Sequence, residues 1–267
     1  MQWQDYQCIS FDWRGRVLVI ALNRPAQLNA VNGRLHTELA QVFADAAADA
    51  ESDVVVLTGT GKAFCAGGDL DWMQSSIDRP AEFEQVAAEA KVIITSQLDL
   101  PKPLICRLNG HATGLGATLA LCCDIPVAHS NVKIGDPHVK VGLVAGDGGA
   151  LIWPALIGYA KAKKYLLTGD LLTATEAERI GLLSEVVPAD SPDALDDATY
   201  GLAERLARGA GQAIRWTKLT ANLPLRQLVH SYFDTGIAYE TLSNRSADHR
   251  EAVAAFRERR DAVFTGA

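Results

Sequence analysis

The sequence contains little cysteine, and the few cysteines show no metal-binding arrangement. The 267 residues include five, an odd number without the paired spacing of zinc ligands: Cys8, Cys65, Cys106, Cys122 and Cys123. Scattered cysteines of this kind are typical of reduced thiols that pack inside a cytoplasmic protein. We therefore expect free thiols, no metal site and a cytoplasmic location.

The sequence also lacks an excess of positive charge and a long apolar run. Its formal net charge is −7, and an acidic chain is repelled by phosphate groups, which argues against a nucleic-acid partner. No stretch of about 18 residues is apolar throughout, so no membrane span is expected. Residues 1–6 lack the basic start of a signal peptide. The chain is long enough to bury a substantial core.

The most informative stretch is 53–70, where a predicted strand leads into glycine-rich turns. A short β-branched run ends at Gly59, and Gly67 and Gly68 precede a segment that can begin a helix. The first N–H groups of a helix have no internal partner and can bind a phosphate or a developing oxyanion. An ordinary strand-to-helix turn has the same composition. A dinucleotide fingerprint is excluded, because Phe64 occupies the third glycine position.

The order of the remaining patterns indicates an α/β fold. A hairpin is predicted over 7–22, and a second glycine-rich turn, 109–116, lies between a strand and a helix. Further strands are predicted at 53–58, 104–108, 125–128, 132–134 and 182–187. Helices are predicted after Asn32 and over 81–98, 117–123, 147–157, 159–168, 173–180, 192–208, 210–221, 224–243 and 248–258. The division expected is a core, 1–189, and a helical C-terminal region, 190–267.

Several motifs, in this order, resemble those of the crotonase superfamily, that is, the enoyl-CoA hydratase/isomerase family. They span 22–30, 61–70, 109–116, 141–149 and 255–260. The resemblance implies a spiral of β-β-α units whose C-terminal region packs against neighbouring subunits in a homotrimer or a dimer of trimers. It also implies an oxyanion hole formed by the N–H groups of Gly68 and Leu115. Coenzyme A, as part of the substrate and not as a cofactor, is expected to contact Ala26, Leu28, Ala66, Asp69 and Leu70.

The two glutamates of the family's hydratases are both absent. Thr118 stands at the first position and His138 at the second. A threonine hydroxyl has a pKa far above neutrality and cannot act as a general base, whereas histidine titrates near pH 7. The two-carboxylate hydration mechanism is therefore not expected to operate unchanged.

The residues around His138 resemble those of the β-diketone hydrolase branch, which includes 6-oxocamphor hydrolase. There a His-Asp pair activates water for C–C cleavage, and the match here is His138 with Asp147. Glu240 resembles an acidic residue that those hydrolases bring to the site. Residues 65–70 keep the coenzyme A pattern, so a thioester substrate stays open. The alternatives are that Asp147 caps a helix beginning near Gly148 and that Glu240 serves only a salt bridge.

Three functions remain open at this stage. The first is an acyl-CoA enzyme that stabilises an enolate, and the second is a C–C hydrolase of a β-diketone or β-ketoacyl substrate. The third is a non-catalytic protein that binds thioesters or RNA. His111 is expected to line the pocket or to pack near it, and Trp72, Met73 and Trp153 are expected to form its apolar walls.

Overall fold

The computed structural model describes residues 2–191 and 193–267. The strands are β1 (Ile9–Arg14), β2 (Val17–Leu22), β3 (Val54–Gly59), β4 (Leu104–Leu108), β5 (Ala112–Thr113), β6 (Ile125–His129), β7 (Lys133–Gly135), β8 (Leu172–Thr173) and β9 (Glu185–Val187). The larger sheet has the order β1-β2-β3-β4-β6-β9, and the smaller has the order β5-β7-β8. Apart from the β1–β2 hairpin, the strands of the larger sheet run parallel.

Helices separate and follow these strands, which confirms the α/β class. The α-helices are α1 (Gly33–Ala48), α2 (Leu70–Asp78), α3 (Glu82–Asp99), α4 (Leu115–Leu121), α5 (Gly149–Ile157), α6 (Tyr159–Thr168), α7 (Ala174–Ile180), α8 (Ala194–Ala207), α9 (Gly211–Ala221), α10 (Leu223–Asn244) and α11 (Ala247–Glu258). Three short 3-10 helices are η1 (Trp3–Asp5), η2 (Pro25–Gln27) and η3 (His138–Val141). None of the helices in the described ranges is long and apolar enough to cross a bilayer.

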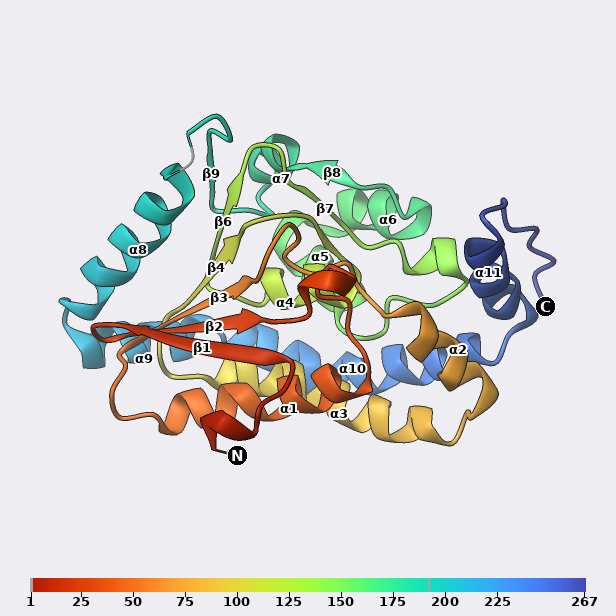
Figure 1. The fold of residues 1–267 in the computed structure, drawn as a ribbon, viewed down its shortest axis with the longest axis horizontal. Coiled ribbons are helices and arrows are strands. Elements are labelled where there is room, and N and C mark those ends of the chain that lie inside the picture. Colours follow the sequence, from red (N-terminus) through yellow and green to blue (C-terminus); the bar gives the residue numbers. More distant parts are fainter. Residues whose placement is uncertain (1, 192) are drawn as a thin grey trace.

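The larger sheet is covered on both faces, which explains the unbroken apolar run over the first four residues of β3. Val55 and Leu57 pack into the main core with residues of α1 and α3. Val54 and Val56 face the opposite way and pack against α8. Side chains alternate along a strand, so a strand buried on both faces reads as a continuous apolar run. Figure 1 shows α8 on one side of the sheet and α1, α3 and α10 together on the other.

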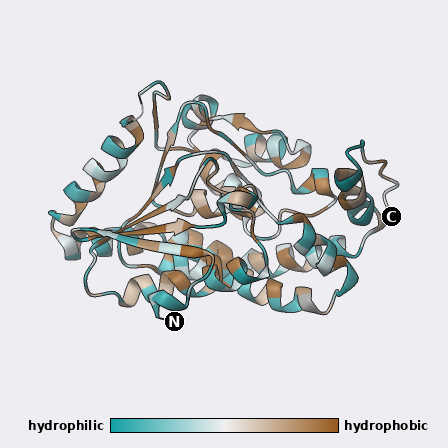
Figure 2. Ribbon diagram, in the orientation of Figure 1, coloured by the Kyte–Doolittle hydropathy of each residue, from teal (hydrophilic) through white to brown (hydrophobic). Residues whose placement is uncertain are grey.

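The C-terminal helices contribute to the same core as the sheet. Leu195 of α8 is fully buried against the strands, and Val229, Phe233 and Ile237 of α10 join the main core. Figure 2 shows hydrophobic residues along the strands and mixed coloration on the helices. The division of the chain at residue 190 stays a prediction. Because α10 packs against the main core, its side chains can contribute to a site there.

Two details differ from the sequence prediction. The helix expected over 117–123 begins earlier, at Leu115, because Gly114 has a φ of +54° and turns the chain directly out of β5. The sequence also predicts no strand near 172, where the structure has β8 at Leu172–Thr173. Both β5 and β8 are two residues long and owe their extended form to pairing with β7, which no local pattern reveals.

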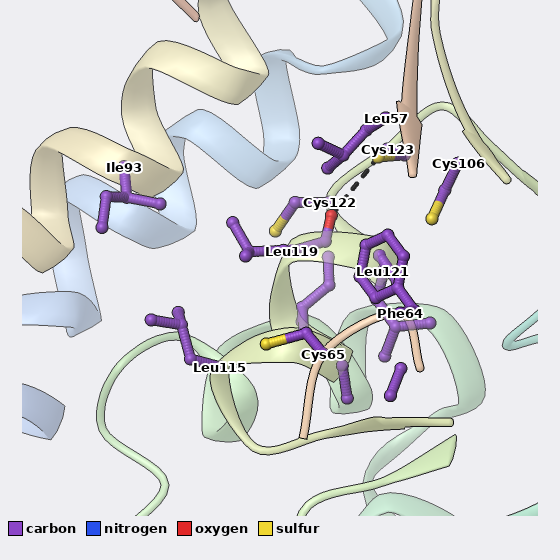
Figure 3. Packing of buried hydrophobic residues seen from close by; sticks show 14 of the residues in the cluster. Leu57, Phe64, Cys65, Ile93, Cys106, Leu115, Leu119, Leu121, Cys122 and Cys123 are labelled. Carbon is purple, nitrogen blue, oxygen red and sulfur yellow. Dashed lines mark hydrogen bonds between the residues drawn. The ribbon is translucent and has the colours of Figure 1, made fainter. Parts of the chain in front are cut away.

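The cysteines pack as the sequence predicts. All five are free and buried, and four of them surround Leu119 and Phe64 in the core (Figure 3). Burial raises the pKa of Cys65 to about 12, so this thiol stays protonated at neutral pH. Inert buried thiols of this kind act as small apolar side chains.

Candidate active site

The two glycine-rich turns lie side by side. Cys65 and Ala112 form a parallel bridge in which the Cys65 N–H donates to the His111 carbonyl at 3.1 Å and the Thr113 N–H donates to the Cys65 carbonyl at 3.0 Å. Gly68 and Leu115 each follow this bridge by three residues. The register therefore carries both to the same place, although they are 47 positions apart in the chain.

The N–H groups of Gly68 and Leu115 are both free to bind a ligand. Neither donates to any acceptor among the residues that the structure describes. Gly68 and Val31 form a parallel bridge, but its two hydrogen bonds are made by the neighbours of Gly68. The Gly67 carbonyl accepts from the Val31 N–H, and the Asp69 N–H donates to the Val31 carbonyl. Leu115 is the first residue of α4, where N–H groups have no partner within the helix.

Both residues line one cavity between the core and the C-terminal helices. Its walls are contributed by α1, α2, α3, η3, α10 and α11 and the loops around them: Val31, His36, Gly68, Trp72, Met73, Ser76, Phe83, Val86, Ala90, Leu115, His138, Leu143, Asp147, Ile237, Glu240, Asn244 and His249. Most of the α2–α3 side is apolar. His138 of η3, Asp147 of the loop after η3, Glu240 of α10 and His249 of α11 are titratable, and His36 of α1 is paired with Glu89.

His138 is held between two carboxylates. Its Nδ1 lies 2.5 Å from Asp136 Oδ1, and its Nε2 lies 3.5 Å from Asp147 Oδ2. Asp136 is 1% exposed and Asp147 is 6% exposed, so both acids are shielded from water. The arrangement fixes the imidazole by its Nδ1–H and leaves Nε2 toward Asp147 and the cavity.

Glu240 reaches this cluster because α10 approaches the loop after η3 very closely. A Cβ on Gly146 would lie 2.2 Å from the Gly236 carbonyl oxygen, so only glycine permits the contact. Glu240 is one turn further along α10 and is 7% exposed. Its Oε2 has no hydrogen-bond partner among the described residues.

The charges of the cluster are set by burial and by one another. Burial lowers the pKa of His138, but the nearby carboxylates of Asp136 and Asp147 outweigh it and raise that pKa well above the usual value. Burial raises the pKa of Asp147. Burial and the negative charge of Asp147 raise the pKa of Glu240 to about 8. At neutral pH the cavity wall thus holds an imidazolium and a neutral carboxylic acid, two groups that can donate a proton.

The donor atoms of Asp136, His138 and Asp147 lie within 4.8 Å of one another, a spacing that a cation could also bridge. His138 Nδ1, however, already faces Asp136 at hydrogen-bond distance, and the imidazolium offsets the carboxylate charge. The three side chains therefore balance one another's charge without a cation, and they can act as a proton-transfer cluster.

A sequence profile described as enoyl-CoA hydratase/isomerase matches residues 13–267. The chain belongs to the enoyl-CoA hydratase/isomerase family. It is 34% identical to a 1,2-epoxyphenylacetyl-CoA isomerase of Escherichia coli over 252 residues, covering 94% of this chain and 95% of that protein. It is 35% identical to an (E)-benzylidenesuccinyl-CoA hydratase of Thauera aromatica, covering 97% and 99%.

The fold agrees with solved structures of the enoyl-CoA hydratase/isomerase family. A structure described as an enoyl-CoA hydratase/isomerase of Mycobacterium paratuberculosis superposes with a TM-score of 0.88 at 32% identity, covering 92% of this chain and 97% of that one. The expected crotonase fold, with a mostly parallel sheet and C-terminal helices, is thereby confirmed.

The residues expected to contact coenzyme A lie around the first glycine-rich turn and the start of α2, and none of them lines the cavity. Ala26, Leu28 and Ala66 are exposed, and the Ala66 N–H donates to the Leu28 carbonyl at 3.1 Å. Asp69 has a structural part: it accepts hydrogen bonds from the first turn of α2, which begins at Leu70, and pairs with Arg24 at 3.0 Å. Contact of these residues with coenzyme A stays a prediction for this family member.

Three residues expected at the site, His111 and Thr118 as substrate-binding positions and Trp153 as an apolar wall, lie outside the cavity lining. His111 is exposed and does not line the cavity; its Nδ1 accepts the Lys133 N–H at 3.0 Å. Trp153 is fully buried in the core behind the site. Thr118 is also fully buried, and it lies against Gly148 outside the lining. The three differences have one cause, because the direction of a side chain from a turn or helix depends on packing that the sequence pattern does not contain.

Other residues of the site were not singled out by sequence reasoning. Asp136 precedes His138 by two positions, and an Asp-Pro-His run was the one available signal for it. His36, Asn244 and His249 also line the cavity, from α1, α10 and the start of α11. Gly148 is the N-cap residue of α5, but a hydrogen bond from the Gly149 N–H, at the start of α5, acts to lower the pKa of Asp147, so the capping alternative stays open beside the catalytic one.

Proposed function

We propose that this protein processes an acyl-CoA thioester by proton transfer next to the thioester carbonyl. The observation that carries the proposal is the position of His138, held by Asp136 and Asp147 on the wall of the same cavity that Gly68 and Leu115 line. Membership of the enoyl-CoA hydratase/isomerase family supports a thioester substrate. No cofactor beyond the coenzyme A of the substrate is required by these groups.

In this proposal the N–H groups of Gly68 and Leu115 form the oxyanion hole. Removing a proton beside a thioester carbonyl places negative charge on the carbonyl oxygen. Two backbone donors fixed by the Cys65–Ala112 bridge can stabilise that charge without moving. One such donor typically lowers the barrier by about 3–4 kcal/mol.

His138 and Asp147 form the proton-transfer pair. The Asp147 carboxylate lines the cavity and, through its raised pKa, is a stronger base than an exposed aspartate. The His138 imidazolium returns a proton to the enolate, while Asp136 fixes the ring through Nδ1. This pair takes the place of the two glutamates of the family's hydratases, with Thr118 contributing no base.

A second candidate is hydrolytic C–C cleavage of a β-diketone or a β-ketoacyl substrate. Asp147 facing His138 Nε2 favours it, because a base on that side can remove a proton from an attacking water. Water adds to the carbonyl carbon, and the C–C bond breaks with its electron pair leaving as an enolate. The enolate takes a proton from His138 or from Glu240, whose pKa of about 8 keeps it protonated at neutral pH.

A paired turnover assay separates these candidates. Purified protein receives crotonyl-CoA, with loss of the conjugated thioester as the signal, and separately a cyclic β-diketone, with ring opening as the signal. Conversion of the thioester supports the first candidate, and ring opening without thioester conversion supports the second. If neither these nor a wider set of acyl-CoA substrates react, the catalytic proposal is wrong and the non-catalytic alternative takes its place.

We also propose assembly as a homotrimer or a dimer of trimers. Large apolar side chains are exposed on the C-terminal helices, among them Trp216 at 63%, Tyr232 at 63%, Leu242 at 64% and Phe256 at 62%. Exposed aromatic groups of this density are typical of subunit contacts. Sedimentation equilibrium tests the proposal, and a monomer at micromolar concentration contradicts it.

A further inference from the structure

The cavity has a polar wall that the proton-transfer chemistry leaves unused. Asn244, at the end of α10, is 2% exposed, and His249, in the first turn of α11, is fully buried. Both line the cavity. Asn244 Oδ1 and His249 Nε2 have no hydrogen-bond partner among the described residues. Buried polar atoms are rarely left unpaired in folded proteins, so a ligand is the expected partner.

His249 presents an acceptor to the cavity. Its Nδ1 lies 2.6 Å from the Val141 carbonyl oxygen, so the ring proton is on Nδ1 and Nε2 carries a lone pair. Burial lowers the pKa of His249, which keeps the ring neutral at neutral pH. The backbone of Gly142, at a φ of +67°, packs directly against His249 and fixes its position.

Asn244 offers a donor next to this acceptor. It follows Glu240 by four residues on α10, so the two side chains share a face of the helix. Its Oδ1 is buried without a partner among the described residues, and a rotation about χ2 places the NH2 group at that position instead. Ser243, the residue before it, accepts the Val144 N–H at 3.1 Å and ties this end of α10 to the loop beyond η3.

The rest of the cavity surface around this wall is largely apolar. Phe83, Val86, Ala90 and Ile237 contribute apolar side chains to the same lining. A plain alkyl chain satisfies these residues but leaves Asn244 and His249 unpaired. A group that carries both a donor and an acceptor pairs with both.

We propose that Asn244 and His249 form a subsite for a hydroxyl group on the acyl part of the substrate, beyond its β-carbon. The hydroxyl donates to His249 Nε2 and accepts from the Asn244 NH2. A carboxylate lacks the proton that Nε2 requires, and an ammonium group lacks the acceptor that the amide requires. The inference rests on the proposed function for the acyl-CoA, but binding alone reports on the subsite.

The test measures binding of matched acyl-CoA pairs by calorimetry. Saturated acyl-CoAs of four to eight carbons are compared with the same compounds carrying one hydroxyl group at each carbon beyond the β-position. Wild-type protein is expected to bind at least one hydroxylated member about ten-fold or more tightly than its partner, since a site built for a hydroxyl discriminates against its absence. Equal affinities within every pair overturn the inference.

Two variants and a control assign any preference to the subsite. Asn244→Leu and His249→Phe are each expected to reduce the preference to less than about two-fold. Tyr239→Phe, on an exposed position of α10, should keep the full preference. A preference that survives in both folded subsite variants contradicts the assignment. If either variant does not fold, the wild-type comparison and the other variant still decide.

The outcome is independent of the proposed reaction. A hydroxyl preference without turnover of any thioester contradicts the proposed function and leaves the subsite standing. Turnover of unsubstituted thioesters without a hydroxyl preference supports the proposed function and contradicts the hydroxyl subsite.

Discussion

Gly146 and Gly236 pack backbone against backbone, and this contact sets how closely α10 approaches the catalytic cluster. A Cβ at Gly146 would lie 2.2 Å from the Gly236 oxygen and 3.0 Å from the Glu240 Cβ. The position of Glu240 beside Asp147 therefore depends on the absence of two side chains. Neither glycine needs a positive φ, so space is the reason for glycine here.

Gly146→Ala is expected to displace α10 and to lower kcat/KM by at least about ten-fold, with a stability loss of about 1–3 kcal/mol from the overpacked contact. Kinetics and thermal unfolding measure the two effects. Gly201→Ala on α8 is the matched control, because nothing lies within 4 Å of its added Cβ. Unchanged kinetics in a folded Gly146→Ala variant would show that this approach does not matter for catalysis.

Gly114→Ala tests the geometry of the oxyanion hole. Gly114 has φ +54° and ψ −128°, and an added Cβ would lie 3.4 Å from the His138 ring. We expect about 1–3 kcal/mol of destabilisation from backbone strain and a fall in kcat of at least ten-fold as the Leu115 N–H moves.

Gly158→Ala provides the comparison for backbone strain. Gly158 also has a positive φ, +75°, and nothing lies within 4 Å of the added Cβ. The Gly158→Ala variant should lose about as much stability as Gly114→Ala but keep full activity. Equal activity losses in the two variants, measured at a temperature where both are folded, would remove the argument for a local effect at Leu115.

Asp147→Asn removes the negative charge beside His138 Nε2 and keeps the size of the side chain. Turnover is expected to fall by about 10²–10⁴-fold, the range typical of lost general acid–base catalysis. Asp136→Asn should instead lower the pKa of His138, because a neutral amide stabilises the imidazolium less than a carboxylate does. Full pH–rate profiles check both, and near-wild-type turnover of Asp147→Asn at every pH rejects the pair.

The raised pKa of Glu240 predicts that the free energy of unfolding decreases as the pH rises. Its pKa is about 8 in the folded protein against 4.5 for the free group, so between these values the folded chain binds more protons than the unfolded chain. The free energy of unfolding must then fall as pH rises through this window, by about 1.4 kcal/mol for each unit of pKa difference.

Glu240→Gln removes the titrating carboxyl, and with it the expected fall in the free energy of unfolding at high pH. Urea unfolding at pH 5 and pH 8.5 should show the variant gaining on wild type at the higher pH, by a few kcal/mol. Asp147 and His138 are present in both proteins, although the variant removes the contribution of Glu240 to the raised pKa of His138. A difference that is constant with pH means that Glu240 is ionised in the folded protein at neutral pH.

The fold was predictable because its main signals are local. A strand buried on both faces, such as β3, is a continuous apolar run, and Asn32 caps α1 through a hydrogen bond to the Leu35 N–H at 2.9 Å. The short strands β5 and β8 were missed because they exist only through pairing with β7. A strand of only two residues is too short for the amino-acid composition or an alternating pattern to indicate it.

The site was predictable where a motif carried it. His138 and Asp147 come from one stretch of the chain, and the structure brings them together. Asn244 and His249 could not be found this way, because they reach the cavity only when α10 packs on α3 and α5 and α11 packs on η3. His111 failed for the opposite reason, since its turn lies at the site but its side chain points to the surface.

The most direct test of the proposed chemistry is hydrogen exchange at the carbon next to the thioester carbonyl. A saturated acyl-CoA is incubated in D2O with wild-type protein and with His138→Gln, and deuterium uptake is followed by mass spectrometry. Uptake is expected with wild type, and its rate is expected to be at least about a hundred-fold lower with the variant. Exchange at equal rates in both proteins, or none with wild type across the acyl-CoA series, would contradict the proposed chemistry.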